Sequence, residues 1–145
     1  MISPKDDRMG RVSVDVELAN NDDVVLARLG AIPPEQVRRV RLNGVVDSGA
    51  TSMVIPEKIA QQLGLTIVGR TKVRYADERV AERDVATGLH VSCCGRDDTF
   101  RAVVEPSRDS VLIGAIVLEA LDLIVDCGKQ QLVPRDPRYI ISYAE

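Results

Sequence analysis

From Arg11 to Leu18, apolar and polar residues alternate without a break, and Val12, Val14 and Val16 share one face with Leu18. Such alternation is typical of a β-strand with one buried face. The rest of the chain has a similar bias, because it contains 21 Val and 10 Ile but only four aromatic residues and no Trp. β-branched side chains fit a pleated, half-buried surface better than a helix. The sequence therefore predicts an all-β or mostly-β fold.

Seven or more short strands and two short helices are expected along the chain. Besides 11–18, strands are expected at 24–29, 66–75, 79–91, 98–104, 111–113, 123–125, 131–133 and 139–141. Helices are expected at about 56–63, where Pro56 suits the first turn and Gly64 the stop, and at 115–121. Residues 1–10 are expected to be a flexible N-terminal segment and 11–145 one domain, since 145 residues is close to the usual domain size. These elements predict a closed β barrel with one or two short helices.

Charge and composition exclude several classes of function. The formal net charge is −3 and His90 is the only histidine, so a nucleic-acid partner is not expected and a multi-histidine metal site is impossible. The longest apolar run, Val111 to Leu118, is too short to span a membrane, so no membrane partner is expected. An odd number of cysteines without a secretory signal favours reduced thiols and a cytoplasmic location.

The most informative segment is the apolar pair Val45-Val46 followed by Asp47-Ser48-Gly49-Ala50-Thr51. An acidic residue directly after an apolar strand lies at the edge of the core, where loss of solvent can perturb its pKa. Ser48 can form local hydrogen bonds, and Gly49 allows a tight turn that exposes the carboxylate. The triplet by itself is weak evidence, so its context in the chain has to decide.

That context resembles the retroviral-type aspartic proteases, in particular their bacterial single-domain members. The segment from Val45 to Pro56 resembles the active-site loop of the family, and Leu112-Ile113-Gly114 followed by an expected helix resembles its second signature. The resemblance covers roughly residues 11–135. It implies a closed β barrel of the acid-protease type and an aspartic endopeptidase.

The resemblance also implies how the chemistry is shared between chains. Each monomer supplies one catalytic residue, Asp47, so that a homodimer brings two carboxylates together. One of them stays protonated while the other activates a water that attacks a peptide bond. Ser48 would support the active site by bonding across the dimer, and Gly49 would let the substrate backbone pass closely. No metal or organic cofactor is required.

Substrate contacts are expected from two segments. Ala50 and Thr51 follow the catalytic loop, and the hairpin 75–80 stands where the family has a flap that closes over an extended peptide. Within this hairpin the expected contacts are Ala76, Asp77, Glu78 and Arg79. Many relatives have a glycine near the flap tip, whereas this tip is bulky and charged. The segment 139–141 is expected to pair with its mate at the dimer interface.

An alternative interpretation is a peptide- or partner-binding module that keeps the barrel without turnover, since fold does not guarantee function. Other motifs have simpler explanations. Asp126-Cys127-Gly128 is expected to be a hairpin turn, His90 a surface or satisfied histidine, and Cys93-Cys94 buried thiols. The pairs Asp22-Asp23 and Asp97-Asp98 are expected to be solvated turns.

Overall fold

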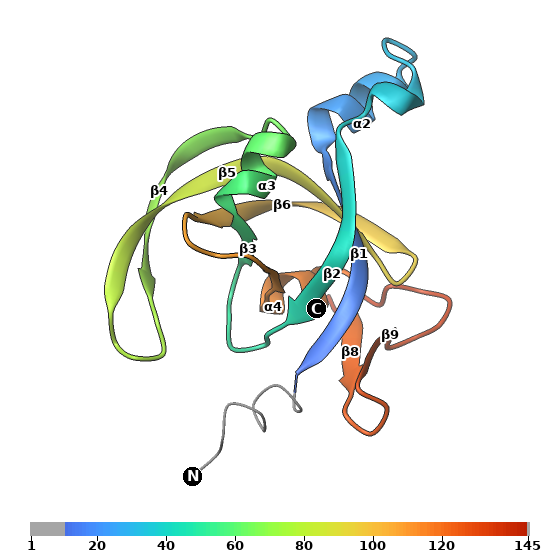
Figure 1. Ribbon diagram of the computed structural model, residues 1–145. Helices are drawn as coiled ribbons and strands as arrows, with labels where there is room; N and C mark the ends of the chain where they lie inside the picture. Colours follow the sequence, from blue (N-terminus) through green and yellow to red (C-terminus); the bar gives the residue numbers. More distant parts are fainter. Residues whose placement is uncertain (1–10, 145) are drawn as a thin grey trace.

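The computed structural model describes residues 11–144 and is built around one seven-stranded sheet that closes on itself. The strand order is β1-β2-β7-β3-β6-β5-β4, and an additional β1–β5 pairing closes six of these strands into a barrel. β4 lies beyond the closure, so β4 and β5 extend from the barrel as a long curved hairpin (Figure 1). The strands are β1 (Val12–Asn20), β2 (Arg39–Val46), β3 (Met53–Pro56), β4 (Thr66–Arg74), β5 (Val80–Cys93), β6 (Arg96–Glu105) and β7 (Val111–Ile113).

The barrel interior contains the apolar face that alternation predicted. Val12, Val16 and Leu18 of β1 are buried, and they pack with side chains from each of the other barrel strands. On β6, Phe100, Ala102 and Val104 point inward; the other core residues include Met53, Ile55, Leu89, Val91 and Ile113. The expectation of an all-β fold with a closed barrel is confirmed.

Short helices connect the strands. α3 (Glu57–Gln62) and α4 (Ala115–Ala120) lie where helices were predicted, although Pro56 precedes α3 rather than forming its first turn. α2 (Asn21–Arg28) and a 3-10 turn, η1 (Pro34–Gln36), connect β1 to β2 at the end of the molecule away from the β4–β5 hairpin (Figure 1). The prediction of a strand at 24–29 is therefore wrong.

The helix α2 forms because of its N-terminal cap and one ion pair. The Asn20 side chain accepts a hydrogen bond from the Asp23 backbone N–H, which satisfies an unpaired amide of the first turn. Asp23 is buried and accepts from the Arg38 guanidinium at 2.8 and 3.1 Å and from the Arg38 backbone N–H at 3.0 Å. The expectation that Asp22-Asp23 is a solvated turn holds for Asp22, which is exposed, and is wrong for Asp23.

This ion pair predicts a pH dependence of stability. Hydrogen bonds from Arg38 hold the pKa of Asp23 below its usual value. The pair therefore stabilises the fold fully above the unfolded pKa of about 3.9, and this contribution is lost as the pH falls through the lower folded pKa. We expect Asp23→Asn to lower the melting temperature at pH 7 and to reduce its fall between pH 7 and pH 3. The control is Asp22→Asn in the same turn; an equal effect of both variants on the pH profile would contradict the prediction.

A second, two-stranded sheet follows the barrel. β8 (Leu123–Asp126) and β9 (Gln131–Pro134) pair around the predicted turn, where Asp126 Oδ1 accepts from the Lys129 N–H. The strand expected at 139–141 is absent from the described chain, because those residues extend without a backbone partner. The segment expected to be flexible, 1–10, lies outside the described residues. Within 11–144, no helix is long and apolar enough to cross a membrane.

Candidate active site

Asp47 lies at the bend that follows β2. Its backbone N–H donates to the Ile113 carbonyl (3.0 Å), which extends the parallel pairing of β2 with β7 by one step. The Gly49 N–H donates to Asp47 Oδ1 (2.9 Å), and the Ala50 N–H donates to the Asp47 carbonyl (3.1 Å). The carboxylate is exposed, so the loop fixes its position while leaving its second oxygen open to a substrate or water.

The Gly114 segment, the second motif, holds this loop in place through hydrogen bonds from the end of the neighbouring strand β7. After β7 the chain turns at Gly114, and the N–H groups of Ala115 and Ile116 donate to the carbonyls of Ala50 and Thr51 at 2.8 and 3.0 Å. A Cβ on Gly114 would overlap the Ser52 carbonyl group and lie 2.9 Å from the Ala50 oxygen. Glycine is therefore required here by close backbone approach, which explains physically why the two motifs occur together.

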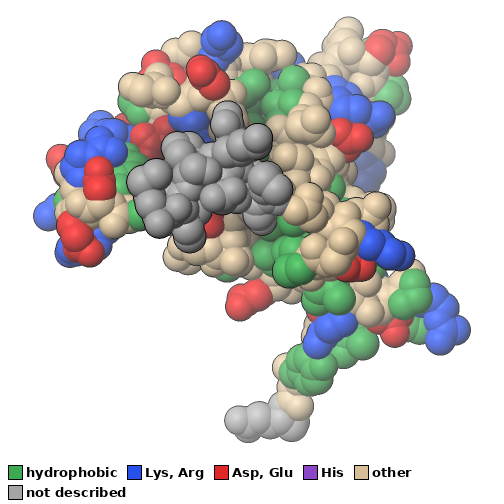
Figure 2. Space-filling view, turned by 60° about the horizontal axis from the view of Figure 1, so that its bottom comes forward, with side chains coloured by type: hydrophobic (Ala, Val, Ile, Leu, Met, Phe, Trp, Pro, Cys, Tyr) green, Lys and Arg blue, Asp and Glu red, His purple; other side chains and the backbone are tan. Residues whose placement is uncertain are grey.

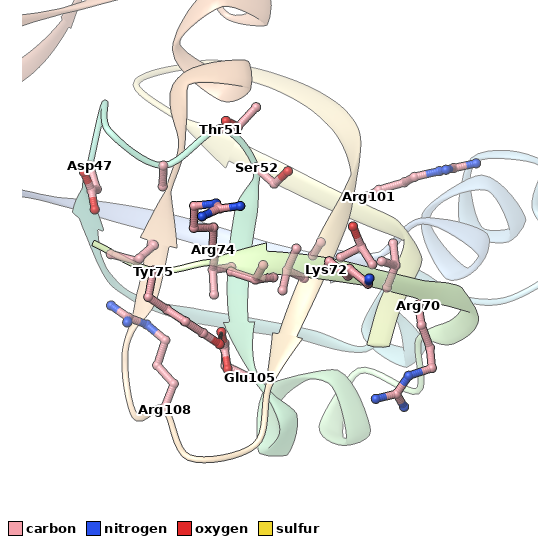
Figure 3. Close-up of a pocket in the computed structure, with 18 of the residues that line it drawn as sticks. Asp47, Thr51, Ser52, Arg70, Lys72, Arg74, Tyr75, Arg101, Glu105 and Arg108 are labelled. Atoms are coloured by element: carbon pink, nitrogen blue, oxygen red, sulfur yellow. Dashed lines mark hydrogen bonds between the residues drawn. The ribbon is translucent and has the colours of Figure 1, made fainter. Parts of the chain in front are cut away.

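An open cleft of about 1040 Å³ extends from Asp47 across the outside of the barrel. Its floor is a row of apolar side chains from four neighbouring strands, in the order Leu112, Val54, Val103 and Val85. The pairings Val54–Leu112, Val54–Val103 and Val85–Val103 put these residues side by side. β4 borders the cleft, and Figure 3 shows the labelled polar residues around it.

Five of the nine residues predicted from the sequence line this cleft. Asp47, Gly49, Ala50 and Thr51 contribute from the loop, and Ala76 contributes from the hairpin. The remaining four do not line it: Ser48 is exposed in the turn beside Asp47, and Asp77, Glu78 and Arg79 form the hairpin tip. The structure therefore brings the loop and the base of the hairpin together and leaves the charged tip outside the cleft.

The hairpin between β4 and β5 closes at the predicted position. The Tyr75 N–H donates to the Arg79 carbonyl (2.8 Å), and Glu78 takes a left-handed φ of 68°, a conformation that favours glycine. Two ion pairs, Arg74–Glu78 and Arg79–Asp77, lie at the tip of the hairpin. Figure 2 shows basic and acidic side chains gathered over this hairpin at the left of the molecule. These pairs are solvent-exposed, so each contributes little to stability.

Sequence reasoning missed a polar cluster that holds the hairpin to the barrel. Glu105, at the end of β6, accepts from the Tyr75 hydroxyl at 2.5 Å and from Arg83 Nε at 2.6 Å. Burial, followed by the hydrogen bond to Glu105, raises the pKa of Tyr75. Alternation along β6 indicates that Glu105 faces away from the core, but its partners are 30 and 22 residues away, and no local pattern predicts them.

The family is identified by comparison with known proteins. A sequence profile of the family described as aspartyl protease matches residues 34–117, more than half of the chain and including both motifs. The chain belongs to the aspartyl protease family. This confirms the resemblance carried by the Asp47 and Gly114 segments.

Other comparisons of this chain give more distant similarities. No curated protein matches it. The foamy viral protease-reverse transcriptase, solved in complex with an RNA/DNA hybrid, is similar at 19% identity and a TM-score of 0.49, over 74% of this chain and 11% of that one. The solution structure of simian foamy virus (mac) protease is similar at 16% identity and a TM-score of 0.48, over 76% of this chain and 94% of that one. The chain thus spans about a tenth of the first protein.

The remaining candidate residues of the chain have structural explanations. His90 Nε2 lies 2.8 Å from Asp97 Oδ2, and the Cys93 side chain is buried, with its pKa raised to about 12 chiefly by burial. Asp97 lies within β6 rather than in a turn, so the turn expected there is wrong. Within residues 11–144, no group of three or more His, Cys, Asp or Glu is placed to hold a metal ion.

Proposed function

We propose that this chain is an aspartic endopeptidase that works as a homodimer and hydrolyses peptide bonds in extended polypeptide segments. The observation that carries the proposal is Asp47. Its carboxylate is exposed at the end of an open cleft, and two strands and the Gly114 turn hold its loop in place. A cytoplasmic location stays a prediction from the sequence.

A second carboxylate has to come from outside the described chain. Hydrolysis by carboxylates requires one group that accepts a proton and one that donates it. Among the described residues, the other carboxylate that lines the cleft is Glu105, and both of its oxygens already accept hydrogen bonds, from Tyr75 and Arg83. Asp47 of a second copy would supply the missing partner.

In such a dimer the two Asp47 carboxylates share the catalytic work. Two carboxylates in contact cannot both ionise easily, so one keeps its proton and the pair titrates as a unit. The charged Asp47 takes a proton from a water, which attacks the scissile carbonyl carbon. The protonated Asp47 donates a hydrogen bond to the carbonyl oxygen and later protonates the leaving nitrogen. Ser48, which is exposed beside Asp47, would bond the partner loop.

The exposure of the C-terminal tail is an argument for the proposed dimer. Tyr139 and Ile140 are 62% and 46% exposed, although they are large and apolar. Arg96 holds this tail to the barrel by donating to the carbonyls of Tyr139 and Asp136. An extended apolar segment that is anchored but has no strand partner within residues 11–144 suits pairing with a second chain.

The proposal predicts that activity depends on association. We expect the protein to sediment as a dimer at micromolar concentration, and its specific peptidase activity to fall when dilution dissociates it. Ile140→Asp puts a charge on the tail and should yield an inactive monomer. The matched control is Leu29→Asp, which alters an apolar residue that is 73% exposed at the end of α2 and should leave dimer and activity unchanged. A monomeric wild type at high micromolar concentration, or an active monomeric Ile140→Asp variant, would refute the dimer mechanism.

A further inference from the structure

The cleft is much more positive than the chain as a whole. Among residues 11–144, two carboxylates line it, Asp47 and Glu105, together with five cations. The whole chain, by contrast, has a formal net charge of −3. The cations are Arg70, Lys72 and Arg74 on the border strand β4, Arg101 on β6, and Arg108 in the loop before β7.

Within residues 11–144, two of these five cations form ion pairs and a third bonds to neutral oxygens, whereas Arg101 forms neither kind of contact. Arg70 pairs with Asp84 and Arg74 with Glu78, and Arg108 donates to the carbonyl and hydroxyl oxygens of Ser110. Lys72 lies opposite Glu82 in the β4–β5 register. Within residues 11–144, Arg101 forms no hydrogen bond or ion pair, and its side chain is exposed.

Register places Arg101 along the same edge of the apolar floor as Asp47, three strands away. β2 and β7 are parallel, β7 and β3 antiparallel, and β3 and β6 parallel, so Asp47, Gly114, Ser52 and Arg101 follow one another across the sheet. In Figure 3, Asp47 lies on one side of the cleft and Arg101 on the other. On β6, Arg101 and Val103 alternate with the core residues Phe100, Ala102 and Val104, and both line the cleft.

The separation corresponds to a defined length of peptide. Three strand spacings of about 4.8 Å lie between β2 and β6, which gives about 14 Å. An extended peptide rises about 3.3 Å per residue, so about four residues cover this distance. A substrate cut at Asp47 would therefore present a side chain near Arg101 about four residues from the scissile bond.

We infer that the cleft selects acidic peptide segments, and that Arg101 binds an Asp or Glu side chain about four residues from the bond that is cut. The apolar floor takes the residues between, and the remaining cations favour the approach of a negatively charged segment. This inference rests on the proposed peptidase function. A nucleic acid fits less well, because the cleft is lined by one aromatic ring, Tyr75, whose hydroxyl is bound to Glu105.

The test measures kcat/KM on matched fluorogenic peptides. Each peptide has a central apolar pair as its cleavage site. In one series a single Glu occupies the second, third, fourth or fifth position on either side of this pair, and in the comparison peptides Gln or Lys replaces that Glu. For the wild type we expect kcat/KM to be about fivefold higher with Glu than with Gln at about the fourth position on one side, and the difference between Glu and Lys to be larger still. A difference of about fivefold is the usual effect of one charge contact at a partly exposed site. The preference should shrink as salt is added.

Variants assign the effect to Arg101. Arg101→Gln should abolish the preference for Glu, and Arg101→Glu should reverse it in favour of Lys. Since Arg101 has no partner within residues 11–144, both variants should keep the melting temperature of the wild type. The matched control is Lys58→Glu, an exposed residue of α3 that does not line the cleft and should leave the preference unchanged. Cleavage that is indifferent to charge at every position would overturn the inference and leave the proposed function standing.

A binding experiment separates the two proposals. Fluorescence anisotropy of the labelled Glu and Lys peptides is measured on Asp47→Asn protein, with and without the Arg101→Glu change. If the wild type cleaves no peptide, but the Glu peptide binds more tightly than the Lys peptide and loses this advantage with Arg101→Glu, the peptidase function fails while the selection of acidic segments by Arg101 stands. A single-stranded oligonucleotide that binds more tightly than the Glu peptide would overturn the inference.

Discussion

Replacing Asp47 with asparagine is expected to reduce peptide cleavage by about 10³-fold or more, the usual scale of a lost acid–base group. In the proposed dimer this change removes both carboxylates at once. An amide can neither take a proton from the attacking water nor return one to the leaving nitrogen. The loss should therefore appear in kcat rather than in KM.

The same substitution should leave the fold unchanged. Asp47 is exposed, and an asparagine Oδ1 can still accept from the Gly49 N–H. Asp126→Asn is the matched control, because Asp126 also follows an apolar strand and also accepts from a nearby backbone N–H, that of Lys129. The control should keep full activity.

Cleavage-site profiling by mass spectrometry on a mixed peptide library, between about pH 4 and 7, measures this prediction. Cuts present in the wild type and in Asp126→Asn, but missing in Asp47→Asn, are the expected result, and they also map the cleft. Identical cuts, or none, for a folded dimeric wild type and Asp47→Asn would contradict the peptidase and favour a peptide-binding module.

Gly114→Ala is expected to have the largest effect on stability among single methyl additions at the site. Its Cβ would overlap the Ser52 carbonyl group and approach the Ala50 oxygen. Both are backbone groups in the loop that carries Asp47, so neither can move without breaking the hydrogen bonds from Ala115 and Ile116. We expect a loss of about 3 kcal/mol in the free energy of unfolding, the upper part of the range for overpacking, together with loss of activity.

Urea unfolding measures this prediction, with Gly69→Ala as the control. Gly69 has nothing within 4 Å of an added Cβ, so alanine should be neutral there or slightly stabilising. A Gly114→Ala variant that unfolds at the same urea concentration as the wild type and remains active would show that the loop is not locked by close backbone approach.

The sequence by itself determined the β class, the positions of α3 and α4, and the loop that carries Asp47. These features depend on signals within a few residues: the alternation before Leu18, the helix stop at Gly64, and the apolar strand that runs into Asp47. The Gly114 motif was also visible in the sequence. The reason that it needs a glycine, which is the close approach of the Ala50 and Ser52 carbonyl groups, appears only in the structure.

Contacts between distant residues decided the rest. Val24 to Leu29 has the composition of a strand, yet most of it belongs to the helix α2. The helix forms because Asn20 caps its first turn and Asp23 pairs with Arg38, fifteen residues away. The tail resembles a strand, but no partner strand reaches it within residues 11–144.

In the cleft, too, some features follow from local sequence signals and others from contacts between distant residues. The sequence named Asp47 and the hairpin, and strand alternation indicates which residues face away from the core. Only the closed sheet put Arg101 across the cleft from Asp47 and joined Tyr75 to Glu105, because strand order and register depend on pairings between segments far apart in the chain.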